Sequence, residues 1–143
     1  MLQVKIAETA EEKEIAFSIR KKVFVEEQGI PLHIEIDEND QTATHFIVLE
    51  NNEPIGAARL RLIDTVIGKV ERVCVLSEYR GKHFGVSVMK AIEEHAKTLQ
   101  VEKLKLNAQT YAIPFYEKLQ FEITSPEFVD AGIPHRAMEK ELN

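Results

Sequence analysis

The chain has 143 residues, of which 44% are hydrophobic and 29% charged, the proportions of an ordinary globular protein. Its formal net charge of −6 argues against general binding to nucleic acid or to a membrane surface, and no apolar run is long enough to span a bilayer. The single cysteine, Cys74, excludes an internal disulfide framework and suits a reducing compartment. We expect one cytoplasmic domain, residues 1–143.

The first elements of the chain predict a strand followed by a helix. Residues 3–7, QVKIA, predict a short strand, and Thr9 with Glu12 forms a capping-box pair ahead of a helix. Apolar residues then recur with helical period over residues 15–23. We expect this helix to end near Gly29, since glycine followed by proline breaks the pattern.

An acidic segment, PLHIEIDENDQT, follows this helix. It has no helical period, so we interpret it as a loop over the surface. Acidic runs of this kind are usually solvated; the alternative is that the run attracts a cationic amine. Phe24, Glu26 and Glu27, at the end of the preceding helix, are the candidate substrate-binding residues on that alternative.

The remaining elements predict a sheet with one crossover. Three strands at 44–51, 55–64 and 68–75 have short connections, which favour antiparallel pairing. A helix with a buried stripe over 88–99 connects the strand at 68–75 to a strand at 103–109. These two strands should therefore be parallel, with a right-handed connection. A short helix at 112–119 and strands at 121–124 and 135–142 close the chain. The predicted fold is α/β (α+β): a mixed, mostly antiparallel twisted sheet with a central parallel strand–helix–strand crossover and flanking helices.

The turn RGKHFG joins a central strand to the amino end of the long helix. Free N–H groups and the positive end of the helix dipole make such a position a natural anion site. Gly81 and Gly85 would let the backbone approach phosphate oxygens, and Arg80 and Lys82 would add positive charge. The alternative is that the glycines only shape the turn. The spacing matches neither a Walker loop nor a dinucleotide fingerprint.

Two motifs resemble those of the GNAT family of N-acetyltransferases. VCVLSEYRGKHFGVSVMKAIEEHA resembles the family's acyl-CoA-binding motif, Arg/Gln-x-x-Gly-x-Gly/Ala, with Arg80 and Gly85 at the matching ends. NAQTYAIPFYEKLQFE resembles the second signature, and RKKVFVEEQGIP resembles a bacterial subgroup of small acetyltransferases. The order of elements agrees from residue 3 to 142. His83 and Gln120 replace glycines of the two family motifs.

The resemblance implies a site for acetyl-CoA. In the family, the pantetheine arm enters between the two parallel strands, where main-chain groups of Val73 and Val75 would pair with it and Asn107 would contact it or an ordered water. Asn107 is otherwise an ordinary residue at a strand end. The pyrophosphate would be held by the main-chain amides of the turn, which are those of Gly81, Lys82, His83, Phe84, Gly85 and Val86.

Acetyl transfer to an amine needs a free amine and a proton for the departing thiolate. Tyr116 matches the family tyrosine assigned as proton donor and is also expected to contact the cofactor. The alternative is a core aromatic whose hydroxyl has a hydrogen-bond partner. Glu71 is the first candidate for the general base, acting through water, although a strand glutamate is more often solvated. Cys74, among valines, is expected to be inert core rather than a covalent carrier.

Two other functions stay open. The chain could be an acyl-CoA-binding regulatory module without turnover, or could resemble the acyl-homoserine-lactone synthases, which use S-adenosylmethionine. The five histidines are scattered without ligand spacing, so no metal is expected. The acceptor amine is not identified by the sequence, and a homodimer is left open.

Overall fold

The computed structural model describes residues 1–142, whose strands form one sheet in the order β1-β2-β3-β4-β5-β8-β6, with β7 paired to β8. The strands are β1 Leu2–Ile6, β2 Thr44–Glu50, β3 Glu53–Leu62, β4 Ile67–Val75, β5 Lys103–Gln109, β6 Glu122–Ile123, β7 Phe128–Asp130 and β8 Ile133–Glu141. The helices are α1 Ala10–Arg20, α2 Leu32–Glu35, α3 Phe84–Thr98 and α4 Ile113–Lys118, with the π-helix η1 Lys21–Glu27 and 3-10 turns η2 Glu38–Gln41, η3 Ser77–Tyr79 and η4 Thr110–Ala112.

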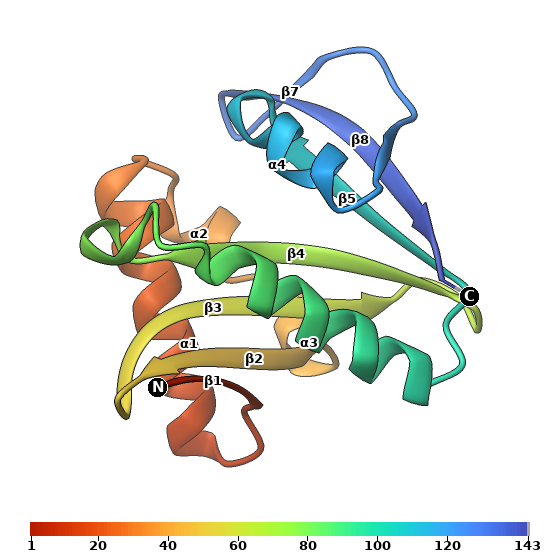
Figure 1. Cartoon of the computed structure of the whole chain (residues 1–143). Helices are drawn as coiled ribbons and strands as arrows, with labels where there is room; N and C mark the ends of the chain where they lie inside the picture. The colour runs from red at the N-terminus through yellow and green to blue at the C-terminus, as the bar shows by residue number, and fades with distance from the viewer. Residues whose placement is uncertain (143) are drawn as a thin grey trace.

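The sheet is antiparallel except for its centre. β4 and β5 pair in parallel, connected by α3, which confirms the predicted mixed sheet with one crossover. Their pairing runs only from Ile67 opposite Lys103 to Val70 opposite Leu106. Beyond that point β4 and β5 diverge, and β5 carries β8 and β7 away from the rest of the sheet (Figure 1).

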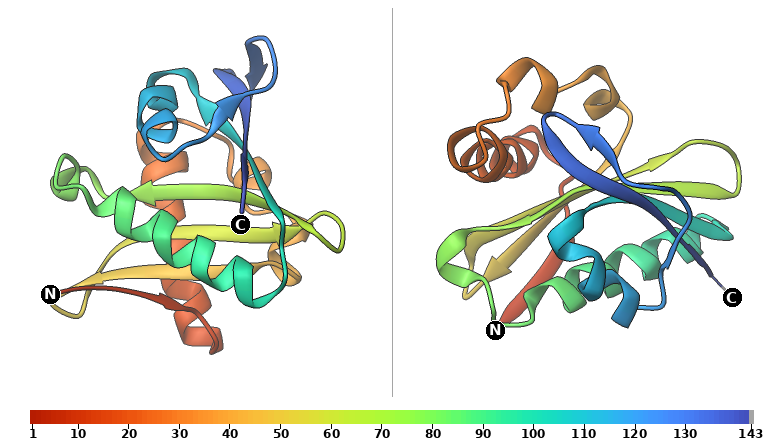
Figure 2. Two further views of the ribbon diagram at one scale, coloured as in Figure 1. Left: turned by 45° about the vertical axis from the view of Figure 1, so that its right-hand side comes forward. Right: turned by 90° about the horizontal axis from the view of Figure 1, so that it is seen from above.

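Helices lie on both faces of the sheet. α1 lies across one face of the β1–β4 part, and α3 lies on the opposite face (Figure 2). α1 begins at the predicted capping box, in which Glu12 N–H donates to Thr9 Oγ1 at 3.1 Å and Thr9 N–H donates to a Glu12 carboxylate oxygen at 3.1 Å. α3 buries Val88 and Ile92 as predicted. Leu99 of the expected stripe lies just past the helix and is 40% exposed.

The acidic segment after η1 differs from the surface loop expected. It forms α2 and η2, and Glu35 and Asp40 are only 2% and 8% exposed. Arg20 on α1 donates to Glu35 at 2.9 Å and to Asp40 at 2.7 Å, and Arg59 on β3 donates to Asp40 at 2.8 Å. Because these arginines are themselves buried, each needs a nearby carboxylate. The segment therefore supplies counter-ions to the core.

Candidate functional site

The divergence of β4 and β5 creates a cavity of about 330 Å³ lined by residues of both strands. Their last paired residues are Val70 and Leu106, so the β4 edge beyond Val70 that faces β5 has no strand partner within the described chain. Val73 and Val75 of this edge and Asn107 of β5 all line the cavity. An exposed strand edge of this kind can hydrogen-bond an extended ligand as if it were an added strand.

A bulge at Arg72 marks the point where the two strands separate. Arg72 has a φ of +61°, and the register between β3 and β4 shifts beside it. Bulges bend a strand and increase its twist, which turns β4 away from β5. The Arg72 guanidinium is held by Glu35 at 3.1 Å and by Asp37 at 3.2 Å. The buried Glu35 and the half-buried Asp37 thereby hold the side chain of the bulge beside the cavity.

The basic turn borders a second cavity of about 430 Å³ at the amino end of α3. Of the residues predicted to hold a pyrophosphate, all but Lys82 line this cavity. They are Arg80, Gly81, His83, Phe84, Gly85 and Val86. Gly81 and His83 both have positive φ, at +79° and +64°. A Cβ at Gly85 would lie 2.8 Å from the Phe115 ring, so this glycine is needed for the packing of α4 against α3. Lys82 is exposed, with Nζ 5.7 Å from the centroid of the Tyr79 ring.

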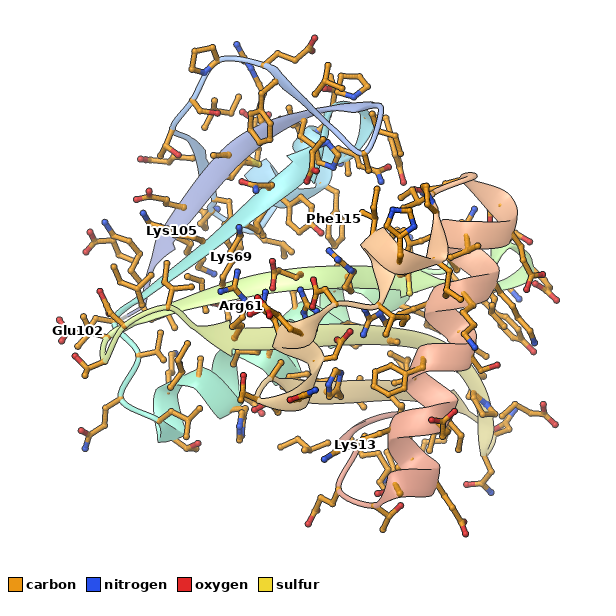
Figure 3. All side chains as sticks on the ribbon, turned by 180° about the vertical axis from the view of Figure 1, so that it is seen from behind. Lys13, Arg61, Lys69, Glu102, Lys105 and Phe115 are labelled. Atoms are coloured by element: carbon orange, nitrogen blue, oxygen red, sulfur yellow. The ribbon has the colours of Figure 1, made fainter. Side chains whose placement is uncertain are left out.

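The two cavities meet at residues that line both of them, Val75, Arg80 and Phe115. Phe115 is labelled in Figure 3, where it projects toward the space between the diverging strands. The cavity at the amino end of α3 therefore adjoins the cavity between β4 and β5, and the two together are elongated. An elongated ligand with an anionic end fits such a shape.

Arg80 is already engaged by a carboxylate of the protein. Its guanidinium donates to the Val75 carbonyl at 2.9 Å and to Glu27 of η1 at 2.8 Å. The hydrogen bond from Arg80 lowers the pKa of Glu27 from its ordinary value. Phe24, also on η1, lines the first cavity, whereas Glu26 and Glu27 are exposed and line neither of these two cavities. Glu27, a predicted substrate-binding residue, is therefore paired with Arg80, a predicted phosphate-binding residue.

Tyr116 on α4 is packed edge to face between Phe115 and Phe121, with ring centroids 5.0 and 5.8 Å away. Burial raises the pKa of its hydroxyl well above the ordinary value, so the group stays protonated at neutral pH. Within residues 1–142 the one fully buried side-chain nitrogen or oxygen without a partner is His45 Nδ1. The Tyr116 hydroxyl has no hydrogen-bond partner in that range either, so it cannot be fully buried. Because Tyr116 lines the first cavity, its hydroxyl opens onto that cavity.

Glu71 lines the same cavity but is held by two arginines. Arg59 lies 2.8 Å from its carboxylate and Arg61 lies 3.1 Å away. Burial alone would raise the pKa of Glu71, but the hydrogen bond from Arg61 and the charge of Arg59 outweigh it and lower the pKa. A carboxylate so stabilised is a weaker base, and the assignment of Glu71 as general base stays a prediction.

Two further side chains bear on the chemistry of the cavity. Burial raises the pKa of the Cys74 thiol to about 12, which leaves little thiolate for covalent catalysis. His135 on β8 lines the cavity opposite Gln109 of β5, and no motif in the sequence singles it out among the five histidines. Only the pairing of β8 with β5 brings it there, and no local sequence signal reports that pairing.

The described chain shows neither a membrane span nor a cluster of metal ligands. None of the helices within residues 1–142 is both long and apolar enough to cross a bilayer. No group of three or more His, Cys, Asp or Glu side chains in that range is arranged to hold a metal ion.

Comparison with known proteins agrees with the motifs of the sequence. Residues 6–142 match a family model described as an acetyltransferase (GNAT) domain. A curated relative from Bacillus subtilis, named an uncharacterized N-acetyltransferase YjcF, is 43% identical over 137 residues, covering 95% of this chain and 97% of the relative.

Solved structures share the fold over nearly the whole chain. Escherichia coli ElaA superposes with a TM-score of 0.88 at 24% identity, covering 99% of this chain and 100% of ElaA. A GNAT family acetyltransferase from Elizabethkingia anophelis, solved with acetyl-CoA bound, gives a TM-score of 0.77 at 18% identity, with 99% and 98% of the two chains covered. These likenesses establish the arrangement of strands and helices, in which β4 and β5 diverge.

Proposed function

The chain belongs to the GNAT acetyltransferase family, and we propose that it moves an acetyl group from acetyl-CoA to the nitrogen of an amine by direct transfer. One observation carries the proposal: the cavity at the amino end of α3 meets the cavity between β4 and β5 at Val75, Arg80 and Phe115. This shape suits a ligand with phosphates at one end and a long, narrow arm at the other.

Acetyl-CoA would lie along these two cavities. Its pyrophosphate would accept hydrogen bonds from main-chain amides of residues 81–86, at the positive end of the α3 dipole. The pantetheine arm would pair with the free β4 edge at Val73 and Val75, and Asn107 would contact it from β5. Arg80 would exchange Glu27 for a phosphate oxygen.

Tyr116 would act at the sulfur. Attack by a free amine on the thioester carbonyl gives a tetrahedral intermediate, which collapses by breaking the C–S bond. The thiolate that leaves needs a proton, and the Tyr116 hydroxyl opens onto the cavity in its protonated form. Its raised pKa makes it a weaker acid, so we expect the proton to move as negative charge develops on sulfur.

The acceptor would enter from the side of η1 and α2. Phe24 of η1 and Ile34 of α2 give apolar surface there, and Asp130 of β7 gives a carboxylate. Glu27, once released by Arg80, would add a second carboxylate near the opening. Carboxylates favour a cationic acceptor, so an ammonium compound is the expected class.

The test is turnover of acetyl-CoA with a mixed panel of primary amines. Free thiol should appear in step with an acetylated amine identified by mass spectrometry. Binding of acetyl-CoA without thiol release from any amine would favour a regulatory module. Product formed only when S-adenosylmethionine and an acylated carrier are present would favour a lactone synthase. Either outcome overturns the proposal.

A further inference from the structure

His135 occupies the wall of the proposed transfer cavity with one ring nitrogen fixed. Its Nδ1 lies 2.7 Å from the carbonyl oxygen of Ile133. A carbonyl oxygen can only accept a hydrogen bond, so Nδ1 carries the hydrogen and Nε2 carries the lone pair of the neutral ring. The ring stacks on Phe128 at 5.9 Å with an interplanar angle of 17°, which holds its plane.

The lone pair on Nε2 is available. His135 is 9% exposed, and no protein group in residues 1–142 hydrogen-bonds Nε2. The one fully buried unpartnered side-chain atom of that range is His45 Nδ1, so His135 Nε2 is open to solvent. Because His135 and Tyr116 line one cavity, an acceptor placed there can meet both a proton acceptor and a proton donor.

The other titratable groups of this cavity are less suited to take a proton. The carboxylates of Glu35 and Glu71 are each hydrogen-bonded by buried or half-buried arginines, so their oxygens are already engaged. The titratable and charged side chains that share the cavity with His135 are Asp130 of β7, Tyr111 of η4, Tyr116 of α4, Glu35 of α2, Arg80, and Lys69, Glu71, Arg72 and Cys74 of β4. His135 is the one imidazole among these cavity residues, and its Nε2 lone pair is not engaged by a protein group of residues 1–142.

We propose that His135 Nε2 takes the proton that the acceptor ammonium must lose before it attacks, an inference that rests on the proposed acetyl transfer. The freed nitrogen lone pair forms the C–N bond to the thioester carbon, the C–S bond breaks, and the sulfur takes the proton of Tyr116. The second nitrogen proton returns to the Tyr116 oxygen. The sum is an amide, free CoA thiol and one proton, which His135 releases to water.

His135→Asn separates this role from a structural one. The asparagine side-chain amide can still donate to the Ile133 carbonyl, but it leaves nothing at the position of Nε2. His33→Asn, the same change at an exposed histidine of α2, is the matched control. The acceptors are ethylamine, fluoroethylamine and difluoroethylamine, which are alike in size and fall in basicity in that order. Kinetics are measured over a range of pH with acetyl-CoA.

For His135→Asn we expect kcat/KM for ethylamine to fall on the order of a hundredfold at neutral pH, as for loss of a general base. The loss should shrink along the series to difluoroethylamine, of which the largest fraction is uncharged, and should shrink at higher pH. The acid limb of the wild-type pH profile should move to the pKa of the amine. An equal loss for all three amines, or an unchanged pH profile, would overturn the role of His135. Absence of wild-type turnover with every amine would instead count against the acetyl transfer itself.

If His135→Asn lowers the melting temperature too far for kinetics, the wild-type protein alone can test the role of His135. The acid limb of its kcat/KM profile must then coincide with the titration of the His135 ring followed by NMR. A limb that does not follow that ring would contradict the proposal. The His33→Asn protein, measured in parallel, should keep the wild-type profile.

Discussion

Gln120 stands at a backbone position that favours glycine. It follows α4 with a φ of +76°, and Phe121 N–H donates to the Tyr116 carbonyl at 3.1 Å while Gln120 N–H donates to that of Glu117 at 3.0 Å. This pair of bonds is a Schellman motif, in which the left-handed residue is usually glycine. A side chain there strains the backbone, and the Gln120 side chain is exposed, so its removal loses little packing.

We therefore expect Gln120→Gly to raise the free energy of unfolding by about 0.5–1 kcal/mol. Urea denaturation of the wild type and the variant measures this difference. Gln41→Gly, at an exposed glutamine without positive φ, should lower stability instead because glycine adds freedom to the unfolded chain. A neutral result for Gln120→Gly would show that the strain is relieved elsewhere.

Tyr116→Phe tests the proposed proton donor. The change keeps the ring between Phe115 and Phe121 and removes only the hydroxyl that opens onto the cavity. We expect kcat to fall by roughly tenfold to a thousandfold, as for loss of a general acid. The dissociation constant of acetyl-CoA, measured by calorimetry on the same protein, should change little. Unchanged kcat would remove Tyr116 from the mechanism, and a large loss of affinity alone would make it a cofactor-binding residue.

At the scale of elements, one buried group of charges joins α1, α2, η2 and β3. Burial alone would raise the pKa of Asp40, but hydrogen bonds from Arg20 and Arg59 outweigh it and lower the pKa from 3.8 to about 2. Asp40 therefore holds fewer protons in the folded than in the unfolded chain. It stabilises the fold above its unfolded pKa, and this contribution is lost as the pH falls from about 5 to about 2. Glu35 acts in the opposite direction, because burial raises its pKa.

Asp40→Asn should lower the free energy of unfolding by about 2 kcal/mol or more at pH 7, since it removes the charge that Arg20 and Arg59 share. The difference from the wild type should shrink as the pH approaches about 2. Denaturation curves at several pH values measure it. The neighbouring Glu38→Gln, at an exposed site, is the control and should leave the pH dependence unchanged. A constant difference at every pH would mean that the carboxylate charge is not what matters.

Local patterns predicted most of the elements, but they missed α2, η2 and β7 and part of the candidate site. Thr9 and Glu12 predicted the start of α1, and the strand–helix–strand order predicted the parallel pair β4 and β5. The bulge at Arg72 was not predictable, since it is stabilised by the Glu35 carbonyl 37 residues away and nothing in the strand itself encodes it. His135 was missed for the same reason, because only the register of β8 on β5 brings it to the cavity.

Across the whole molecule, the pairing of Arg80 with Glu27 changes what salt should do to cofactor binding. Proteins that bind phosphates with free cations release counterions into solution and lose affinity as salt is added. Here the binding site carries its own counterion, Glu27, and the chain has a formal net charge of −6 that repels an anionic ligand. When a phosphate replaces Glu27 on Arg80, one ion pair is exchanged for another and no net counterion is released. Added salt also screens the repulsion between the negatively charged chain and acetyl-CoA.

We therefore expect the dissociation constant of acetyl-CoA to stay level or to fall slightly as ionic strength rises from about 0.01 M to about 0.15 M, over which the Debye length shortens from about 30 Å to about 8 Å. Glu27→Gln should bind more tightly at low salt and weaken as salt is added. Glu11→Gln, the same change in net charge at the exposed far end of α1, should keep the wild-type response. Ordinary weakening of the wild type by salt would show that Glu27 does not compete with the phosphates. With that competition, the affinity for acetyl-CoA would be nearly independent of the ionic strength around the protein.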